Sequence, residues 1–355
     1  MTRRVKLGTA AFVALVAAVL SLPSTPHAQD APRYEVDASW PKPLPYRWVL
    51  GGLGGLCVDA KGHVLILNRQ DVIEGDLNGG TLAPPMIEFD PDGTAVNAWG
   101  DPSLIDARLH SCHFDREGNV WIASAPSGMV QKYSRDGRTL LLQIGTKGKL
   151  DSSDGTLKGK PLNSPAAAFF MPSSIFVDPT SGDVYVSDGE GAGSNRRIVV
   201  LDRTGRFLRH WLIEDMEVVH CMTIANDGVV YVCDRMGSAI RLYDKTGKLL
   251  RTIAVPWTPV TPPTGGVAKQ SGGSAVAIDF SPDPAQRLMF VINQNNAQIE
   301  IIERATGKNL GSFGRPGSAP GHFNQVHGIA VDGQGNVYLA ENRGRRVHKF
   351  RPVTP

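Results

Sequence analysis

Three histidines, His110, His220 and His327, occupy the same place in a repeated sequence unit, and only in every second copy of that unit. The unit is an apolar run, an acidic or small residue, a Gly-containing turn and a second apolar run. If its six copies form a ring, the three histidines lie about a third of a turn apart and face one axis. Three neutral imidazoles bind zinc well and leave one coordination position for water or substrate. The spacing therefore predicts a metal site at the centre of a ring.

The copies between the histidine-bearing ones carry small residues at the same position. We align Gly54, Ser173 and Ser274 with the histidines, so that the centre of the ring keeps room for an ion. A single histidine in a strand is usually structural, whereas three at matching positions are hard to obtain by chance. The pattern favours metal binding over a structural role.

The elements that must position these residues are short strands. The repeats run at roughly 40–50 residues, the spacing of four-stranded propeller blades, and Asp-Gly and Thr-Gly pairs mark their hairpin turns. The sequence predicts an all-β fold, a six-bladed β-propeller of one domain over residues 29–355. Blade 6 shows only three strands, so we expect residues 34–37 to pair with residues 347–350 and close the ring.

Two arginines and a glutamate are expected at the same mouth of the channel as the histidines. Each histidine begins the first strand of its blade, while Arg69 and Arg235 follow the second strand, which returns to the same face. Arginine holds a carboxylate through paired hydrogen bonds. Glu190 follows the second strand of blade 3 and can reach this mouth as a proton acceptor. Salt-bridging arginines and an ordinary loop glutamate are the alternatives.

The first 28 residues have the pattern of an export signal. Arg3, Arg4 and Lys6 precede an apolar stretch that ends near Leu22, and Ala28 is a candidate cleavage site. An uncleaved anchor is the alternative, because the stretch is nearly long enough to span a bilayer. We predict a signal peptide over residues 1–28 and a periplasmic or secreted protein.

The bulk composition limits the classes of partner. A formal net charge of +3 is too small to argue for nucleic-acid binding. We expect a small-molecule or peptide substrate, no membrane contact beyond the export signal, and a loop face that can take a protein partner. Residues 70–85, 146–170 and 256–273 break the repeat pattern and are candidates for a lid or rim. Disordered decoration is the alternative for the last two.

The four cysteines permit disulfide bonds in an oxidising compartment. Cys221 and Cys233 flank one predicted hairpin turn symmetrically, so a bridge and two buried thiols both stay open. Cys57 and Cys112 lie in different repeats at unmatched positions, which argues against a bridge between them.

The blade pattern resembles NHL-repeat propellers, and the placement of the histidines narrows the resemblance to peptidyl-α-hydroxyglycine α-amidating lyase. This resemblance implies that His110, His220 and His327 hold a zinc ion and that Arg69 and Arg235 are functional. It also implies a reaction that splits a carbinolamide into an amide and glyoxylate. The similar segments are residues 55–69, 109–122, 178–200, 220–235 and 327–350.

Two positions depart from the pattern of this family. Its catalytic tyrosine follows the Ser-Asp-Gly of blade 3, where this chain has Glu190. Its aspartate after the last zinc histidine, associated with a structural calcium, is replaced by Gly328, which makes a calcium site doubtful. Carboxylate and phenol differ greatly in pKa, so the proton transfer cannot be carried over unchanged.

These observations favour a zinc-dependent enzyme of the peptidylamidoglycolate lyase type over two alternatives. The first alternative is a non-catalytic periplasmic NHL propeller that serves as a binding or assembly module, and the changed tyrosine position favours it. The second is a calcium-dependent sugar-acid hydrolase. It ranks last, because calcium prefers oxygen ligands and the axial residues here are imidazoles.

Overall fold

The computed structural model describes residues 31–106, 108–258 and 273–353. One compact unit runs from Ala31 to Pro355, and the predicted export signal lies outside the described residues. Among the described residues, no helix combines the length and the apolar character needed to cross a membrane.

The described residues form six four-stranded antiparallel sheets, the blades of a β-propeller. Blade 1 contains β3 (Leu53–Val58), β4 (Val64–Asn68), β6 (Met86–Phe89) and β7 (Ala95–Trp99). Blade 2 contains β8 (Leu109–Phe114), β9 (Val120–Ser124), β10 (Met129–Tyr133) and β11 (Leu140–Ile144). Blade 3 contains β12 (Pro172–Val177), β13 (Val184–Asp188), β14 (Arg197–Leu201) and β15 (Phe207–Leu212).

The second half of the ring repeats this arrangement. Blade 4 contains β16 (Val219–Ile224), β17 (Val230–Asp234), β18 (Ala239–Tyr243) and β19 (Leu249–Ala254). Blade 5 contains β20 (Ala275–Phe280), β21 (Leu288–Asn293), β22 (Gln298–Glu303) and β23 (Asn309–Phe313). Blade 6 contains β24 (Val326–Val331), β25 (Val337–Glu341), β26 (Val347–Val353) and β1 (Arg33–Val36).

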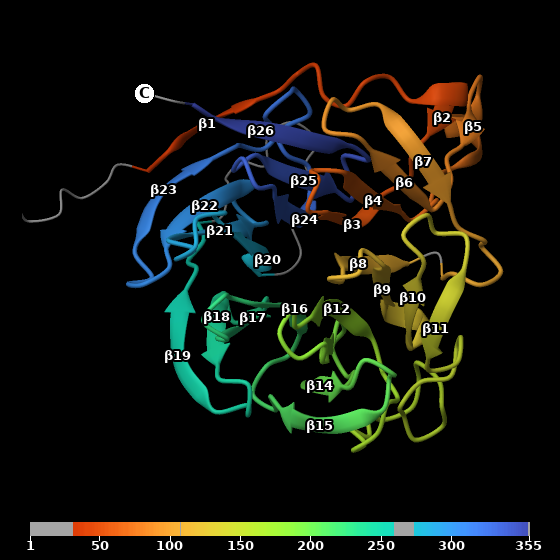
Figure 1. Cartoon of the computed structure of the whole chain (residues 1–355), viewed down its shortest axis with the longest axis vertical. Coiled ribbons are helices and arrows are strands. Elements are labelled where there is room, and N and C mark those ends of the chain that lie inside the picture. The colour runs from red at the N-terminus through yellow and green to blue at the C-terminus, as the bar shows by residue number, and fades with distance from the viewer. Residues whose placement is uncertain (1–30, 107, 259–272, 354–355) are drawn as a thin grey trace, which may run out of the picture. The chain divides into compact units, whose positions relative to one another are not determined.

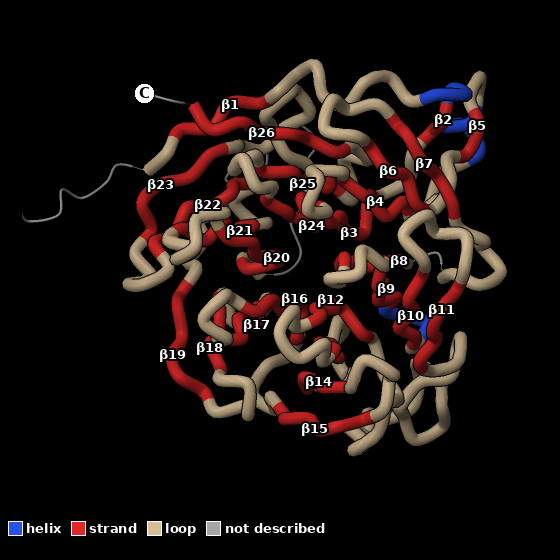
Figure 2. The backbone as a smooth tube through the Cα atoms, viewed as in Figure 1, coloured by secondary structure: helices blue, strands red, loops and turns tan. Residues whose placement is uncertain are grey.

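The remaining regular structure is short. A small parallel pair joins β2 (Trp48–Val49) to β5 (Thr81–Leu82). Single 3-10 turns cover Pro45–Arg47, Glu74–Leu77 and Ala125–Ser127. Figure 2 shows strands making up most of the regular structure, with loops between the blades. The sequence-based expectation of an all-β propeller is confirmed.

The innermost strands of the six blades surround a central channel. Each of them contacts the inner strand of the next blade, and β24 contacts β3, so the ring closes (Figure 1). Apolar side chains of neighbouring blades pack between the sheets, and each of these layers forms its own buried cluster, as Trp121, Val130 and Ile175 do between blades 2 and 3. Burying one such side chain stabilises the fold by about 1.5–3 kcal/mol. The inner strands are therefore held rigidly around the channel.

The first strand of the chain closes blade 6, as the sequence predicts, but further along its partner. Arg33 lies opposite Val353, and Val36 lies opposite Phe350. The pairing is displaced by two residues from the expected one, so that only Lys349 and Phe350 of the expected segment meet the N-terminal strand, the Asp37 N–H donating to the Lys349 carbonyl oxygen at 2.8 Å. Strand β26 is seven residues long and extends beyond β25, so its second half offers the outer edge to β1.

The sequence alignment of blade 5 was wrong by two residues. Ala275 pairs with Asn293 as Val219 pairs with Asp234, so Val276, and not Ser274, stands at the histidine position. The connection from β20 to β21 is longer than the other first hairpins and has no glycine in its turn. Because the alignment relied on that turn, the longer connection displaced it.

Two disulfide bonds reinforce the inner strands. Cys221 and Cys233 are bridged across the first hairpin of blade 4, with their Cα atoms 4.9 Å apart. Cys57 and Cys112 are also bridged, with their Cα atoms 5.7 Å apart, which overturns the expectation that they stay unpaired. That expectation assumed that only equivalent positions meet. The inner strands β3 and β8 lie side by side with an offset: Gly54, the counterpart of His110, lies against the Leu109 carbonyl oxygen, and the same offset brings Cys57 to Cys112.

Removing the Cys57–Cys112 bridge should cost more stability than removing the other one. The bridge closes a sequence separation of 55 residues, against 12 for Cys221–Cys233. Loop entropy then assigns losses of about 4 and about 3 kcal/mol to the two double alanine variants. Urea denaturation of both variants and the parent measures these losses. A larger loss for the Cys221/Cys233 variant would contradict the chain-entropy account.

Candidate metal centre

Each of the three histidines is the second residue of an inner strand, and each lies where the pairing with the second strand shifts register. The shifts fall between Leu109 and Ser111 in blade 2 and between Val326 and Gly328 in blade 6, and blade 4 has the same irregularity. A bulge of this kind re-aims a side chain that regular pairing would direct elsewhere. The repeated bulge therefore turns the histidines toward the axis.

The structure brings the three predicted ligands together. The ring centroid of His110 lies 5.0 Å from that of His220 and 4.7 Å from that of His327. The centroids of His220 and His327 are 5.1 Å apart. All three residues are buried, with at most 7% of their surface exposed. The six inner strands, with the three histidines among their residues, line a channel cavity of about 220 Å³.

The next blade fixes the orientation of each imidazole. The Nδ1 atom of each histidine faces a carbonyl oxygen of the next blade. The distances are 2.5 Å from His110 to Ser173, 2.7 Å from His220 to Val276, and 2.7 Å from His327 to Gly54. A carbonyl oxygen only accepts, so each Nδ1–H donates, and in the neutral ring this leaves the lone pair on Nε2. The residues between the histidines in the repeat thus set the tautomer.

The histidines are suited to bind a cation in their neutral form. Burial lowers the pKa of His220 to about 3 and holds the pKa of His327 well below its usual value. The Nε2 atoms of His110 and His220 are buried without a hydrogen-bond partner. A buried polar atom without a partner is rare in folded proteins and requires a cause. A bound metal ion supplies one, so the residues present fit the zinc site that the sequence predicts.

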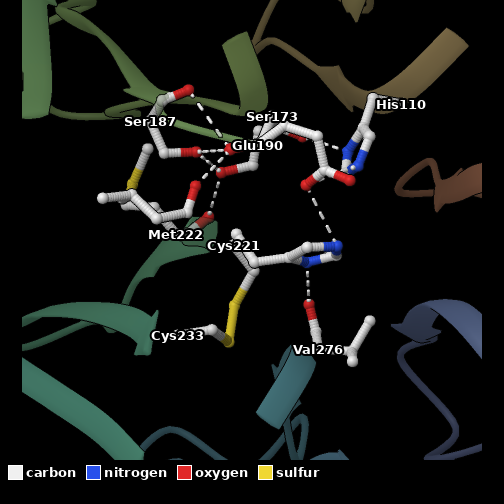
Figure 3. The surroundings of a disulfide bond; sticks show 11 residues. His110, Ser173, Ser187, Glu190, Cys221, Met222, Cys233 and Val276 are labelled. Atoms are coloured by element: carbon white, nitrogen blue, oxygen red, sulfur yellow. Dashed lines mark hydrogen bonds and ion pairs between the residues drawn. A yellow bond between two sulfur atoms is a disulfide. The ribbon is translucent and has the colours of Figure 1, made fainter. Parts of the chain in front are cut away.

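Glu190 joins this cluster. Its Oε2 atom lies 3.2 Å from the Nε2 atoms of both His110 and His220, and Figure 3 shows the carboxylate beside the His110 ring. The four residues each offer one ligand atom, and these atoms lie within 4.8 Å of one another. Burial alone would raise the pKa of Glu190, but positive charge at the adjacent His220 and His110 lowers it well below its usual value. A metal ion held by neutral imidazoles would supply the same positive charge and so favour the ionised glutamate.

A buried ionic network holds the loop that carries Glu190. Arg197 is fully buried. Its Nε atom lies 2.9 Å from Asp188 Oδ2, and its Nη2 atom lies 3.2 Å from Asp151 Oδ2. The Asn195 side-chain amide donates to both carboxylates at 2.9 Å. Asp151 belongs to the stretch 146–170, which packs here against blade 3 with Phe169 buried. This stretch supports the Glu190 loop as a rim, in place of the disordered decoration that was the alternative.

The two predicted arginines lie at the histidine end of the channel. Arg69 is 9% exposed, and its Nε donates to the Leu109 carbonyl oxygen at 3.0 Å. Burial lowers its pKa to about 10, so the guanidinium is still charged at neutral pH. Arg235 has its Nη1 atom 3.9 Å from Glu190 Oε1 and donates through Nη2 to Gln294 at 2.9 Å.

Gln294 also lies at the histidine end of the channel, and the sequence analysis did not predict it as a site residue. It directly follows β21, as Arg69 follows β4 and Arg235 follows β17, so the repeat carried a signal for it. Its amide donates to the Val326 carbonyl oxygen at 3.0 Å, just before His327. Gln294 therefore positions Arg235 and the histidine strand of blade 6 together.

A second group of possible ligands needs no metal ion. Asp59, His63 and Glu88 lie close enough to share one, but Arg135 already pairs with both carboxylates. The guanidinium supplies the positive charge that these carboxylates require.

Gly328 has a steric explanation. A Cβ atom at this position would lie 2.8 Å from the Cα atom of Gly55 in the neighbouring inner strand. Strands β24 and β3 approach each other so closely that no side chain fits between them. An aspartate at this position would push the two strands apart.

Comparisons with known proteins agree with this architecture. No protein-family model matches the chain. The chain is 29% identical over 338 residues to NHL repeat-containing protein 3 of Homo sapiens, a match that covers 90% of this chain and 84% of that protein. It is 24% identical over 351 residues to peptidyl-glycine alpha-amidating monooxygenase B of Xenopus laevis. That match covers 90% of this chain and 35% of the monooxygenase, so the chain spans about a third of its length.

The solved structures show the same fold. A streptogramin B lyase structure superimposes with a TM-score of 0.57 and 16% identity, covering 90% of this chain and 98% of that one. A virginiamycin B lyase from Staphylococcus aureus gives a TM-score of 0.53 and 17% identity, covering 85% and 96% of the two chains. The chain is a six-bladed β-propeller that resembles NHL repeat-containing proteins and a part of the peptidyl-glycine alpha-amidating monooxygenases.

Proposed function

We propose that this protein is an exported, zinc-dependent enzyme of the lyase type that acts on a small carboxylate-bearing substrate. A peptidyl-α-hydroxyglycine is the substrate we infer from the similarity to the amidating monooxygenases. The observation that carries the proposal is the convergence of three imidazoles whose Nε2 atoms face one point beside two arginines. That donor set suits a transition metal, and the arginines suit a carboxylate.

The residues at the histidine end of the channel would have separate roles in such a reaction. Bound zinc supplies a Lewis acid that polarises a substrate oxygen. Arg69 and Arg235 hold the substrate carboxylate and so orient the carbinolamide carbon. The hydroxyl proton leaves, the C–N bond breaks, the aldehyde of glyoxylate forms, and the amide nitrogen takes a proton. Glu190 is the carboxylate near the site that can take up the hydroxyl proton.

The two disulfide bonds support the proposed location. Disulfides persist in the periplasm and outside cells, and are rare in a reducing cytosol. An exported protein keeps these bridges without further protection, which fits the export signal expected from the sequence.

The decisive experiment combines metal analysis with an assay. Elemental mass spectrometry should find about one zinc or other transition-metal ion per chain, as a single three-histidine site requires, and none in a triple His110/His220/His327→Ala variant. The metal-loaded protein should release glyoxylate from a peptidyl-α-hydroxyglycine. Absence of metal from both proteins would contradict the proposal and favour the non-catalytic binding module.

A further inference from the structure

We propose that Glu190 is the fourth protein ligand of the metal centre, so that three imidazoles and one carboxylate close the site in its resting state. The inference rests on the proposed function, because it requires that the centre bind a metal ion. It gives Glu190 a role beyond that of proton acceptor. It also predicts that a substrate meets a site whose open position is already filled by the chain itself.

The first argument is that three buried polar atoms face one another here without a hydrogen-bond partner. The Nδ1–H groups of His110 and His220 donate to carbonyl oxygens, so in the neutral rings the Nε2 atoms carry the lone pairs that a cation can accept. Glu190 Oε2 lies 3.2 Å from both, and none of the three atoms has a hydrogen-bond partner. All three are buried, so unrelieved contact between them would be costly. A cation held in common by the three atoms removes the conflict.

The second argument is the spacing. Two ligand atoms about 2.0–2.1 Å from a tetrahedral zinc ion lie about 3.3 Å apart. The observed contacts of 3.2 Å between Glu190 Oε2 and the two Nε2 atoms match that edge of a tetrahedron. The ligand atom of His327 belongs to the same cluster, in which the four atoms lie within 4.8 Å of one another. The Glu190 carboxylate therefore lies at a distance from the two imidazoles that suits a shared metal ion.

The third argument is that the backbone fixes Glu190. The backbone N–H groups of Gly189 and Glu190 both donate to the Met171 carbonyl oxygen, at 2.9 and 3.0 Å. The buried Arg197–Asp188 pair holds the start of the same loop. The glutamate side chain is 9% exposed, so it has little freedom to turn outward. A rigid presentation of this kind is typical of metal ligands, which are oriented by a second layer of contacts.

The other carboxylate oxygen has a consequence for substrate binding. Glu190 Oε1 faces Arg235, with 3.9 Å to the Nη1 atom. Glu190 thus occupies both the metal side and the arginine side of the position that a substrate carboxylate would take. An incoming carboxylate must displace Glu190 from at least one of them. The Glu190 carboxylate therefore competes with the substrate carboxylate for the same binding position.

Metal affinity tests the inference directly. Glu190→Gln keeps the shape of the side chain and removes its charge, and Glu190→Ala removes the ligand. Because loss of an outer-layer contact lowers metal affinity 10–100-fold, loss of a ligand should lower zinc affinity by at least about 100-fold, measured by chelator competition. Glu217→Gln is the matched control, since it removes an exposed carboxylate three residues before His220 and should leave affinity unchanged.

Cobalt spectra of the same proteins supply the second readout. With Co²⁺ bound, the visible spectrum of the parent should respond to added acetate only at much higher concentration than that of Glu190→Ala, because in the parent acetate must first displace Glu190. Equal zinc affinity of the parent and Glu190→Gln, with equal acetate responses, would overturn the inference and leave the proposed zinc lyase standing. Failure of the parent to bind zinc or cobalt would overturn both.

Discussion

Replacing His110 with alanine should abolish turnover of a peptidyl-α-hydroxyglycine while the propeller stays folded. The variant removes one of three imidazoles whose Nε2 atoms converge. Because even contacts behind a metal ligand are worth 10–100-fold, we expect kcat/KM to fall by at least about 10³-fold. The fold should survive, because the ring makes one hydrogen bond to the protein, to the Ser173 carbonyl oxygen, and such a bond contributes about 1 kcal/mol.

The control for this variant is another histidine of the same chain. His63 pairs with Glu88 outside the histidine cluster, and His63→Ala should keep both turnover and metal. Glyoxylate release, metal content and the circular dichroism spectrum are measured for the parent and both variants. Unchanged turnover in His110→Ala would exclude a catalytic role for the metal centre.

Replacing Arg197 with methionine should cost about 3–5 kcal/mol of unfolding free energy and also weaken metal binding. The guanidinium is 0% exposed and lies between Asp188 and Asp151. Methionine fills the space but leaves two buried carboxylates without a counter-charge, and breaking a buried pair has this cost. The loop that begins after Asp188 presents Glu190, so its loosening should reach the histidine cluster. Chemical denaturation and chelator competition measure the two effects.

Arg206→Met provides the comparison for Arg197→Met. Arg206 pairs with Asp202 four residues earlier, and its side chain is 78% exposed. Exposed ion pairs contribute little to stability, so this variant should unfold almost as the parent does. Similar losses in the two variants would show that the buried network does not support the site.

The candidate site could be predicted from sequence because a repeat turns sequence position into spatial position. The histidines recur at one place in the unit, and a closed ring makes that place an axis. Arg69 and Arg235 followed from the reversal of direction between antiparallel strands. Both steps use backbone geometry alone, which every blade shares.

The features that the sequence did not predict depend on how blades meet or on departures from the repeat. The Cys57–Cys112 bridge needs the offset between the inner strands β3 and β8, which no single repeat encodes. Val276 was missed because the first hairpin of blade 5 is longer and lacks the glycine turn. The reach of Glu190 into the histidine cluster depends on a loop conformation that is fixed by residues outside the repeat pattern of the inner strands, among them Met171 and Arg197.

The pairing of β1 with β26 sets the order of events during folding. Strands within a blade are close in the chain and can form early, but β1 and β26 lie near opposite ends of the described residues. Contacts between such distant segments form late, because the chain between them must first be ordered. Until then, the edge of β26 is open to strands of other molecules. The N-terminal strand therefore protects the folded propeller from edge-to-edge aggregation by covering the outer edge of β26.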